Sequence, residues 1–141
     1  MKFRFRLDPM LKIADRKLKT LKSELNTVVS RRQTVEEMIE KHKQESLRED
    51  QNLASATGGR EALLFFHHRK GRENQLRLLQ ERLQAFLNLE ETLQQEIVSV
   101  NYEIHRLETA KDKARAKFKR ELIKQEDKEL DEIATLRYKG R

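Results

Sequence analysis

Two runs of apolar residues at heptad spacing dominate this chain, and residues 54–59, Ala-Ser-Ala-Thr-Gly-Gly, separate them. The heptad positions of the first run are Leu11, Ala14, Leu18, Leu21, Leu25, Val28, Arg32, Val35, Ile39, His42, Ser46, Glu49, Leu53 and Ala56. Those of the second run are Leu76, Leu79, Leu83, Phe86, Glu90, Leu93, Ile97, Val100, Ile104, Leu107, Lys111, Ala114 and Phe118. Side chains at this spacing lie on one face of a helix, so the runs predict two long helices that pack along their apolar faces.

Local signals mark where the two helices begin and end. Asp8-Pro9 predicts a helix start, because Asp accepts hydrogen bonds from the free N–H groups of the first turn and Pro loses no bond at the first helical position. Gly58-Gly59 predicts the end of the first helix, since Gly tolerates the left-handed conformation at a helix C-terminus. We therefore expect one all-α coiled-coil domain over the whole chain. Its predicted elements are helices over about 9–56 and 60–136 and a turn at about 57–59.

The short turn also predicts how the two helices pair. Folding at Gly58 brings together residues whose numbers sum to about 116, which makes a long antiparallel two-helix coiled-coil hairpin. Residues 1–22, with eight basic and two acidic side chains, then lie beside roughly residues 94–114. That stretch overlaps residues 81–110, which carry two basic and six acidic side chains, and this charge match favours the hairpin over two parallel chains. Residues after about 115 form a C-terminal helical overhang.

The part of the predicted seam nearest the turn is polar. His42, Ser46 and Glu49 are consecutive heptad positions, and they lie opposite roughly residues 67–74, which are also polar. That stretch contains Gly71, and Gly inside a helix costs about 1 kcal/mol relative to Ala. We therefore expect the two helices to be loosely packed here.

The composition excludes several classes of function. One Pro, four Gly and 39% charged residues fit long helices rather than a compact domain. The chain has no Cys, which removes disulfides and thiolate metal sites. No apolar run approaches the roughly 20 residues needed to span a bilayer, and the N-terminus has no apolar signal core. No phosphate-binding loop or dinucleotide motif is present, and a two-helix rod offers no enclosed pocket. We therefore expect no enzymatic activity, no cofactor and no small-molecule substrate.

Four consecutive apolar residues follow the turn and form the first candidate site. They are Leu63, Leu64, Phe65 and Phe66. On a helix they point in four directions about 100° apart, and the seam can cover about two of them. Either the others contact a partner, or the four together staple the turn. His67 and His68 follow; adjacent helical residues diverge, whereas metal-binding pairs sit four apart, so we expect a solvated pair and no metal site.

The segment 111–141, with eleven basic and seven acidic side chains, is the second candidate site. Its cationic candidates are Lys117, Lys119, Arg120 and Lys124. They can meet an acidic protein surface, lipid headgroups or nucleic acid, or they can form an ordinary solvated helix face. The apolar residues of the overhang have little to pack against within the hairpin, which favours a binding role for the overhang as a whole.

Both ends of the chain resemble one known family. Residues 2–17, K-F-R-F-R-L-D-P-M-L-K-I-A-D-R-K, resemble the opening of the FliJ family, the small coiled-coil proteins of the bacterial flagellar export apparatus. Residues 128–134, K-E-L-D-E-I-A, resemble a stretch near the C-terminus of that family. The length, basic charge and hairpin layout also agree, although heptads like those in between recur in many unrelated proteins.

The resemblance implies a non-enzymatic stalk and adaptor of flagellar type III protein export, needed for flagellum assembly and motility. Such a protein is cytoplasmic, and the export apparatus holds it at the cytoplasmic face of the inner membrane. The implied partners are the hexameric export ATPase FliI, the export gate protein FlhA and export chaperones. On that model the end with both termini enters the ATPase ring, and the start of the second helix, with Leu63–Phe66, contacts the gate or a chaperone. The candidate ring contacts are Phe3, Phe5, Lys117, Lys119, Arg120, Lys124, Leu130, Asp131 and Ile133.

Two alternatives stay open beside this expectation. A basic coiled-coil protein can bind nucleic acid, but repeated alternation of aromatic with basic residues is limited to Phe3 and Phe5, and acidic residues occur throughout residues 111–141. The equivalent stalk of a virulence type III secretion system has a similar shape, and the sequence does not separate it from the flagellar one.

Overall fold

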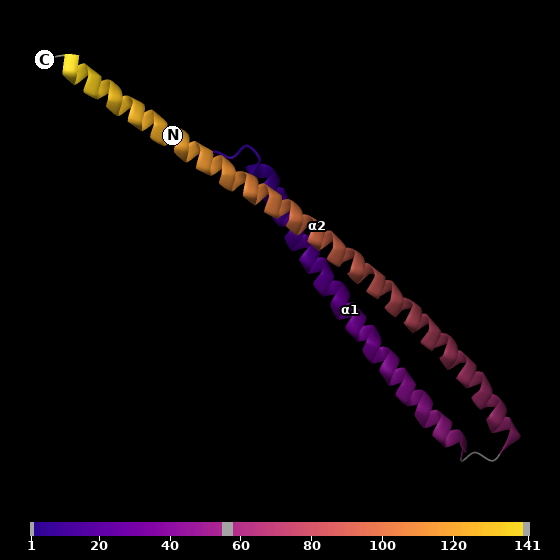
Figure 1. Cartoon of the computed structure of the whole chain (residues 1–141). Helices are drawn as coiled ribbons and strands as arrows, with labels where there is room; N and C mark the ends of the chain where they lie inside the picture. Colours follow the sequence, from indigo (N-terminus) through magenta and orange to yellow (C-terminus); the bar gives the residue numbers. More distant parts are fainter. Residues whose placement is uncertain (1, 55–57, 140–141) are drawn as a thin grey trace. The chain divides into compact units, whose positions relative to one another are not determined.

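The computed structural model describes residues 2–54 and 58–139, which form two α-helices and no strand. Helix α1 spans Asp8–Ala54 and helix α2 spans Gly59–Lys139. The two helices pack against each other, which confirms the all-α hairpin predicted from the heptads (Figure 1).

The chain divides into two compact units, and each contains a part of both helices. We call Met1–Lys19 with Val98–Arg141 the terminal unit, because it contains both chain termini. We call Thr20–Ile97 the turn unit, because it contains the connection between the helices. Within each unit the α1 segment runs alongside the α2 segment (Figure 1).

Helix α1 begins one residue earlier than predicted. The N–H of Leu11 donates to the carbonyl of Leu7 at 3.1 Å, so Leu7 is the N-cap residue and Asp8 and Pro9 occupy the first two helical positions. Pro9 still removes no hydrogen bond there, since the first four N–H groups of a helix have no intrahelical acceptor. The Asp8 carboxylate lies in the first turn, where it complements the positive end of the helix dipole.

The prediction for the two glycines of the turn is wrong. The N–H of Ala62 donates to the carbonyl of Gly58 at 3.1 Å, and Gly59 is the first residue of α2, so this pair begins the second helix. Neither glycine has a positive φ, whereas a left-handed helix terminus would need one. The predicted end of the first helix near residue 56 and the start of the turn at 57 lie outside the described residues. Helix α2 continues three residues past the predicted end at 136.

The heptad seam is confirmed along both helices. Every predicted heptad position that the structure describes is buried or half-buried, from Leu11 to Leu53 and from Leu76 to Phe118. The buried residues of the terminal unit are Leu11, Ala14, Val100 and Ile104. Those of the turn unit are Leu21, Val28, Val35, Ile39 and Leu93. Two helices alone leave each core residue partly open at its sides, and no described side chain falls below 2% exposure.

The register between the helices differs from the prediction by three to six residues, about one to one and a half turns. In the terminal unit Asp8 contacts Lys111, and in the turn unit Arg32 contacts Glu90 and Glu49 contacts Arg72. The residue numbers of these pairs sum to 119–122 rather than about 116. The cause lies at the turn, where residues 59–64 of α2 are all exposed and Phe65 is the first to reach the seam.

Candidate partner-binding surfaces

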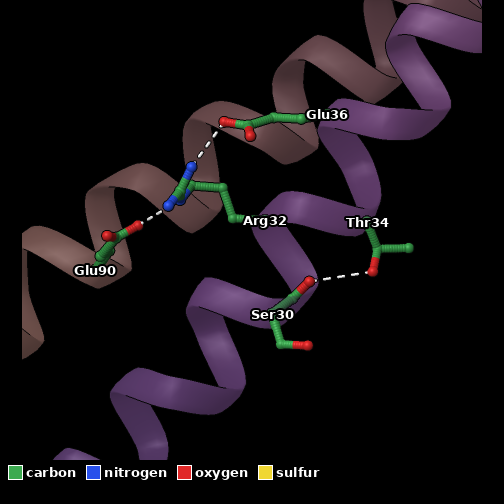
Figure 2. Close-up of polar contacts among 5 residues, drawn as sticks. All are labelled: Ser30, Arg32, Thr34, Glu36 and Glu90. Atoms are coloured by element: carbon green, nitrogen blue, oxygen red, sulfur yellow. Dashed lines mark hydrogen bonds and ion pairs between the residues drawn. The ribbon is translucent and has the colours of Figure 1, made fainter.

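A charged pair interrupts the apolar seam of the turn unit. Arg32 occupies a heptad position of α1, and its Nε lies 2.7 Å from Glu90 Oε2, at a heptad position of α2. Its Nη1 lies 2.8 Å from Oε1 of Glu36, one turn further along α1. Figure 2 shows Arg32 reaching between these two carboxylates. Hydrogen bonds to Glu36 and then to Glu90 raise the pKa of Arg32 above its usual value, because both stabilise the charged guanidinium.

A second pair joins the helices in the terminal unit. Lys111, the other charged heptad position of α2, places its Nζ 2.8 Å from Asp8 Oδ1 at the start of α1. The hydrogen bond from Lys111 lowers the pKa of Asp8 below its usual value, and the positive charges of Lys111 and Lys12 act in the same direction. Both charged interruptions of the second heptad run are therefore ion-paired to α1.

A polar cluster takes the place of the apolar core near the turn. The Arg72 side chain is only 11% exposed, and its Nε lies 2.8 Å from Glu49 Oε2 and its Nη2 3.8 Å from Asp50 Oδ1. Neither approach has hydrogen-bond geometry, so these are ion pairs without a directed bond. Both ring nitrogens of His42 are buried, and neither forms a hydrogen bond with a described residue. A buried polar group without a partner costs about 1–3 kcal/mol, so this cluster weakens the hairpin.

Open clefts flank this polar cluster, which bears out the predicted loose packing. One cleft of about 490 Å³ is lined by Met38, Lys41, His42, Glu45, Gln75, Leu78, Leu79 and Arg82. A neighbouring cleft of about 530 Å³ is lined by His42, Glu45, Glu49, Leu64, His67, His68, Gly71, Arg72 and Gln75. Arg72 itself was missed from the sequence, although the heptad pattern extended back from Leu76 reaches it and Phe65.

The four apolar residues after the turn divide between seam and surface. Phe65 is half-buried, and the guanidinium carbon of Arg72 lies 5.5 Å from the centre of its ring. The remaining three, Leu63, Leu64 and Phe66, are all more than half exposed. The seam therefore covers one of the four rather than two, and the other three form an exposed apolar surface that we call the tip surface. His67 and His68 are exposed beside it, and no group of His, Asp or Glu within the described ranges could hold a metal ion.

The arm that precedes α1 is anchored to α2 by aromatic contacts. The rings of Phe3 and Phe118 lie 5.6 Å apart, and the guanidinium carbon of Arg115 lies 5.6 Å from the centre of the Phe3 ring. Phe5 is also half-buried. A cleft of about 370 Å³ lies beside the arm and is lined by Phe3, Arg4, Phe5, Asp8, Pro9, Lys12, Lys111 and Arg115.

The expected charge match between the helices is not present in the terminal unit. The contacts Asp8–Lys111 and Phe3–Phe118 place the basic start of α1 beside about residues 100–118, which carry five basic and three acidic side chains. Residues 2–19 and 111–120 together carry thirteen basic and three acidic side chains. We call these two segments the basic collar. Of the predicted ring contacts, it contains Phe3, Phe5, Lys117, Lys119 and Arg120.

The overhang differs in charge from the collar that it follows. Residues 121–139 carry six acidic and four basic side chains, so the basic character expected for the whole C-terminal segment ends at Arg120. Apart from the half-buried Leu122, every residue of this segment is exposed. The overhang contains the remaining predicted ring contacts, Lys124, Leu130, Asp131 and Ile133.

Across residues 2–54 and 58–139, no helix is both long enough and apolar enough to cross a membrane.

Comparison of the chain with protein-family models, curated proteins and solved structures found no match in any of the three.

Proposed function

We propose that this chain is a non-enzymatic stalk and adaptor of a flagellar type III protein export apparatus. The proposal rests on the likeness of residues 2–17 and 128–134 to the two ends of FliJ-family proteins. One observation supports it most: these two segments are more than a hundred residues apart in the chain, yet both belong to the terminal unit. A single binding end can therefore use both.

In this proposal the terminal unit enters the ring of the hexameric export ATPase FliI. The basic collar supplies a positive surface on two adjacent helices, which would steer the chain toward an acidic ring lining. The overhang extends the contact by exposed apolar side chains. The tip surface, at the start of α2, contacts the gate protein FlhA or an export chaperone. The chain acts in the cytoplasm, and these partners hold it at the inner membrane.

The ring contact is tested by reversing charge in the collar. The variant Lys117→Glu/Lys119→Glu/Arg120→Glu should bind the purified export ATPase at least about tenfold more weakly than the wild-type chain, because like charges would then face an acidic lining. The matched control Lys22→Glu/Arg31→Glu/Lys43→Glu makes the same charge change at exposed positions of the turn unit. It should bind normally. Equal ATPase affinity for the collar variant and the control would overturn the assignment of the ring end.

The basic collar also favours a second candidate function, binding of nucleic acid. Thirteen basic side chains on two adjacent segments could neutralise several phosphates, and Phe3 lies among them. This candidate requires that the affinity for DNA or RNA fall steeply with salt and that the collar variant lose it. If the chain binds the ATPase and shows no salt-dependent affinity for DNA or RNA, nucleic-acid binding is excluded. The stalk of a virulence secretion system would use the same surfaces. Comparing the affinity of the chain for a flagellar and for a virulence export ATPase distinguishes these two stalk functions.

A further inference from the structure

The overhang presents an apolar face that no described part of the chain covers. Ile123, Leu130, Ile133 and Leu136 are each more than half exposed. Ile123 and Leu130 are seven residues apart, and Leu130, Ile133 and Leu136 follow at intervals of three, so they lie on one side of the helix. A row of this kind is typical of a helix that packs against another helix.

All six acidic residues of the described overhang lie within its first twelve residues. Residues 121–132 carry six acidic and two basic side chains. The basic collar, which ends at Arg120, carries thirteen basic and three acidic ones. The collar is also self-repelling, because its two basic segments lie side by side. An acidic helix laid along the collar would relieve that repulsion.

The collar has exposed apolar side chains where such a helix could pack. Met10 and Ile13 are 51% and 64% exposed and sit three residues apart on α1. They flank the seam residues Leu11 and Ala14, which are buried against α2. A third helix over Met10 and Ile13 would therefore extend the existing core rather than form a separate contact.

We propose that a second copy of the chain supplies this third helix, with the overhang of each copy lying antiparallel along the collar of the other. The overhang cannot fold back onto its own collar, because α2 runs without a break from Lys111 through Glu121 into the overhang. A two-fold axis near that residue brings each overhang onto the other collar, so both contacts form at once and the assembly closes as a dimer. A parallel arrangement would place collar against collar and is opposed by charge.

This inference goes beyond the proposed stalk function and does not depend on it. The dimer covers Lys117, Lys119 and Arg120 together with the apolar face of the overhang. A dimeric chain therefore cannot enter an ATPase ring by that end. If the terminal unit also enters the ATPase ring as proposed above, dimerisation and ring binding compete for the same surface.

Sedimentation equilibrium of the purified full chain tests for the dimer. Over about 1–100 µM protein at low salt we expect a monomer–dimer equilibrium, and its dissociation constant should rise at least about tenfold at high salt because the contact is electrostatic. A chain ending at Arg120 should be monomeric throughout. The proposal is overturned if the full chain is monomeric at every concentration, or if the shortened chain dimerises equally well.

A charge exchange tests the pairing of overhang with collar. The overhang variant Glu126→Lys/Asp127→Lys/Asp131→Lys and the collar variant Lys113→Glu/Lys117→Glu/Lys119→Glu should each be monomeric, because both contacts of either homodimer are mismatched. All six positions are exposed, so no core is lost, and circular dichroism should show unchanged helix content. An equimolar mixture should form a heterodimer. In it the reversed overhang meets the reversed collar, and the unchanged collar meets the unchanged overhang, so both contacts are matched.

A matched control shows that the effect belongs to these surfaces. The variant Glu37→Lys/Glu40→Lys/Glu96→Lys makes the same charge change as the overhang variant, at exposed positions of the turn unit. It should dimerise like the wild-type chain. A mixture of overhang and collar variants that stays monomeric, or an overhang variant that dimerises as well as this control, contradicts the antiparallel arrangement.

Discussion

Arg32 of α1 and Glu90 of α2 each interrupt one of the two heptad runs, and they meet across the seam with Nε and Oε2 2.7 Å apart. Their side chains are 21% and 17% exposed, so each would be a poorly hydrated charge without the other. Such a pair specifies how two helices align, because a shift of one heptad in either direction sets both charges against apolar side chains.

Breaking this pair from one side should destabilise the hairpin more than removing it entirely. Arg32→Leu leaves Glu90 without its partner and should lower the melting temperature by several degrees. The double variant Arg32→Leu/Glu90→Leu should melt at or above the wild-type temperature, because two apolar side chains then meet in the seam. Circular dichroism melts of the single and double variants check this. A double variant less stable than Arg32→Leu would show that the pair is needed for stability itself.

The contact between Asp8 and Lys111 should make stability depend on pH. The pKa of Asp8 is lowered from 3.8 by the hydrogen bond from Lys111, so the native state favours the charged carboxylate. The stabilisation is complete above the unfolded-state pKa and is lost as pH falls through the lower native value. Asp8→Asn should therefore melt below wild type at pH 7, and the gap should close below pH 3.8. A gap that persists unchanged in acid would exclude the ion pair as its cause.

Replacing the unpartnered imidazole in the seam should stabilise the chain. His42→Leu removes two buried nitrogens that have no described partner and adds an apolar side chain at a heptad position. We expect the free energy of unfolding to rise by about 1 kcal/mol in urea titrations. His105→Leu, at an exposed position, should change it by less than about 0.5 kcal/mol. A His42→Leu variant less stable than wild type would mean that the imidazole has a partner.

Gly71 should be replaceable by Ala with a gain in stability. The residue is helical, its φ is not positive, and an added Cβ would meet nothing within 4 Å. Gly71→Ala should raise the free energy of unfolding by about 1 kcal/mol, because Gly loses more backbone freedom than Ala on entering a helix. Urea titration measures this directly. A loss of stability instead would indicate that the cleft lined by Gly71 closes in solution, so that an added Cβ meets other side chains.

The tip surface should matter for binding and not for folding. Leu63→Ser/Leu64→Ser/Phe66→Ser changes only exposed side chains, so the melting temperature should stay close to wild type while affinity for the gate protein or a chaperone falls. Phe65→Ser provides the matched contrast, since that ring is half-buried beside Arg72 and its loss should lower stability. Calorimetric titration with the purified partners measures the affinity. Unchanged affinity in the triple variant would leave the tip surface without a role in binding.

The heptad pattern alone predicted both helices, the seam and the loose stretch around His42, because side-chain periodicity reports directly on which face is buried. Either heptad run by itself leaves the register open, because Arg32 and Glu90 each interrupt only their own run. Treated as opposite charges that must meet, they predict a sum of 122, which the structure has. The role of Gly58 was missed for another reason. Glycine is common both after one helix and before the next, and a short connection offers both positions.

The candidate surfaces were predictable only in part. The excess of apolar residues at Leu63–Phe66 follows from helix geometry, but which of them reaches the seam depends on where α2 first contacts α1. The charge of the C-terminal segment was averaged over residues 111–141, which hid the change of sign after Arg120. That change can be read from the sequence alone by counting charges on either side of Arg120.

Ion pairs tie α1 to α2 in the terminal unit at Asp8–Lys111 and in the turn unit at Arg32–Glu90. An insertion or deletion between these points in one helix would break a tie unless the other helix changed by the same number of residues. Related chains of different length should therefore vary in step along the paired helices, or else vary only in the connection and beyond Phe118. For protein engineering, a reporter domain or tether at either of these places leaves both ion pairs intact.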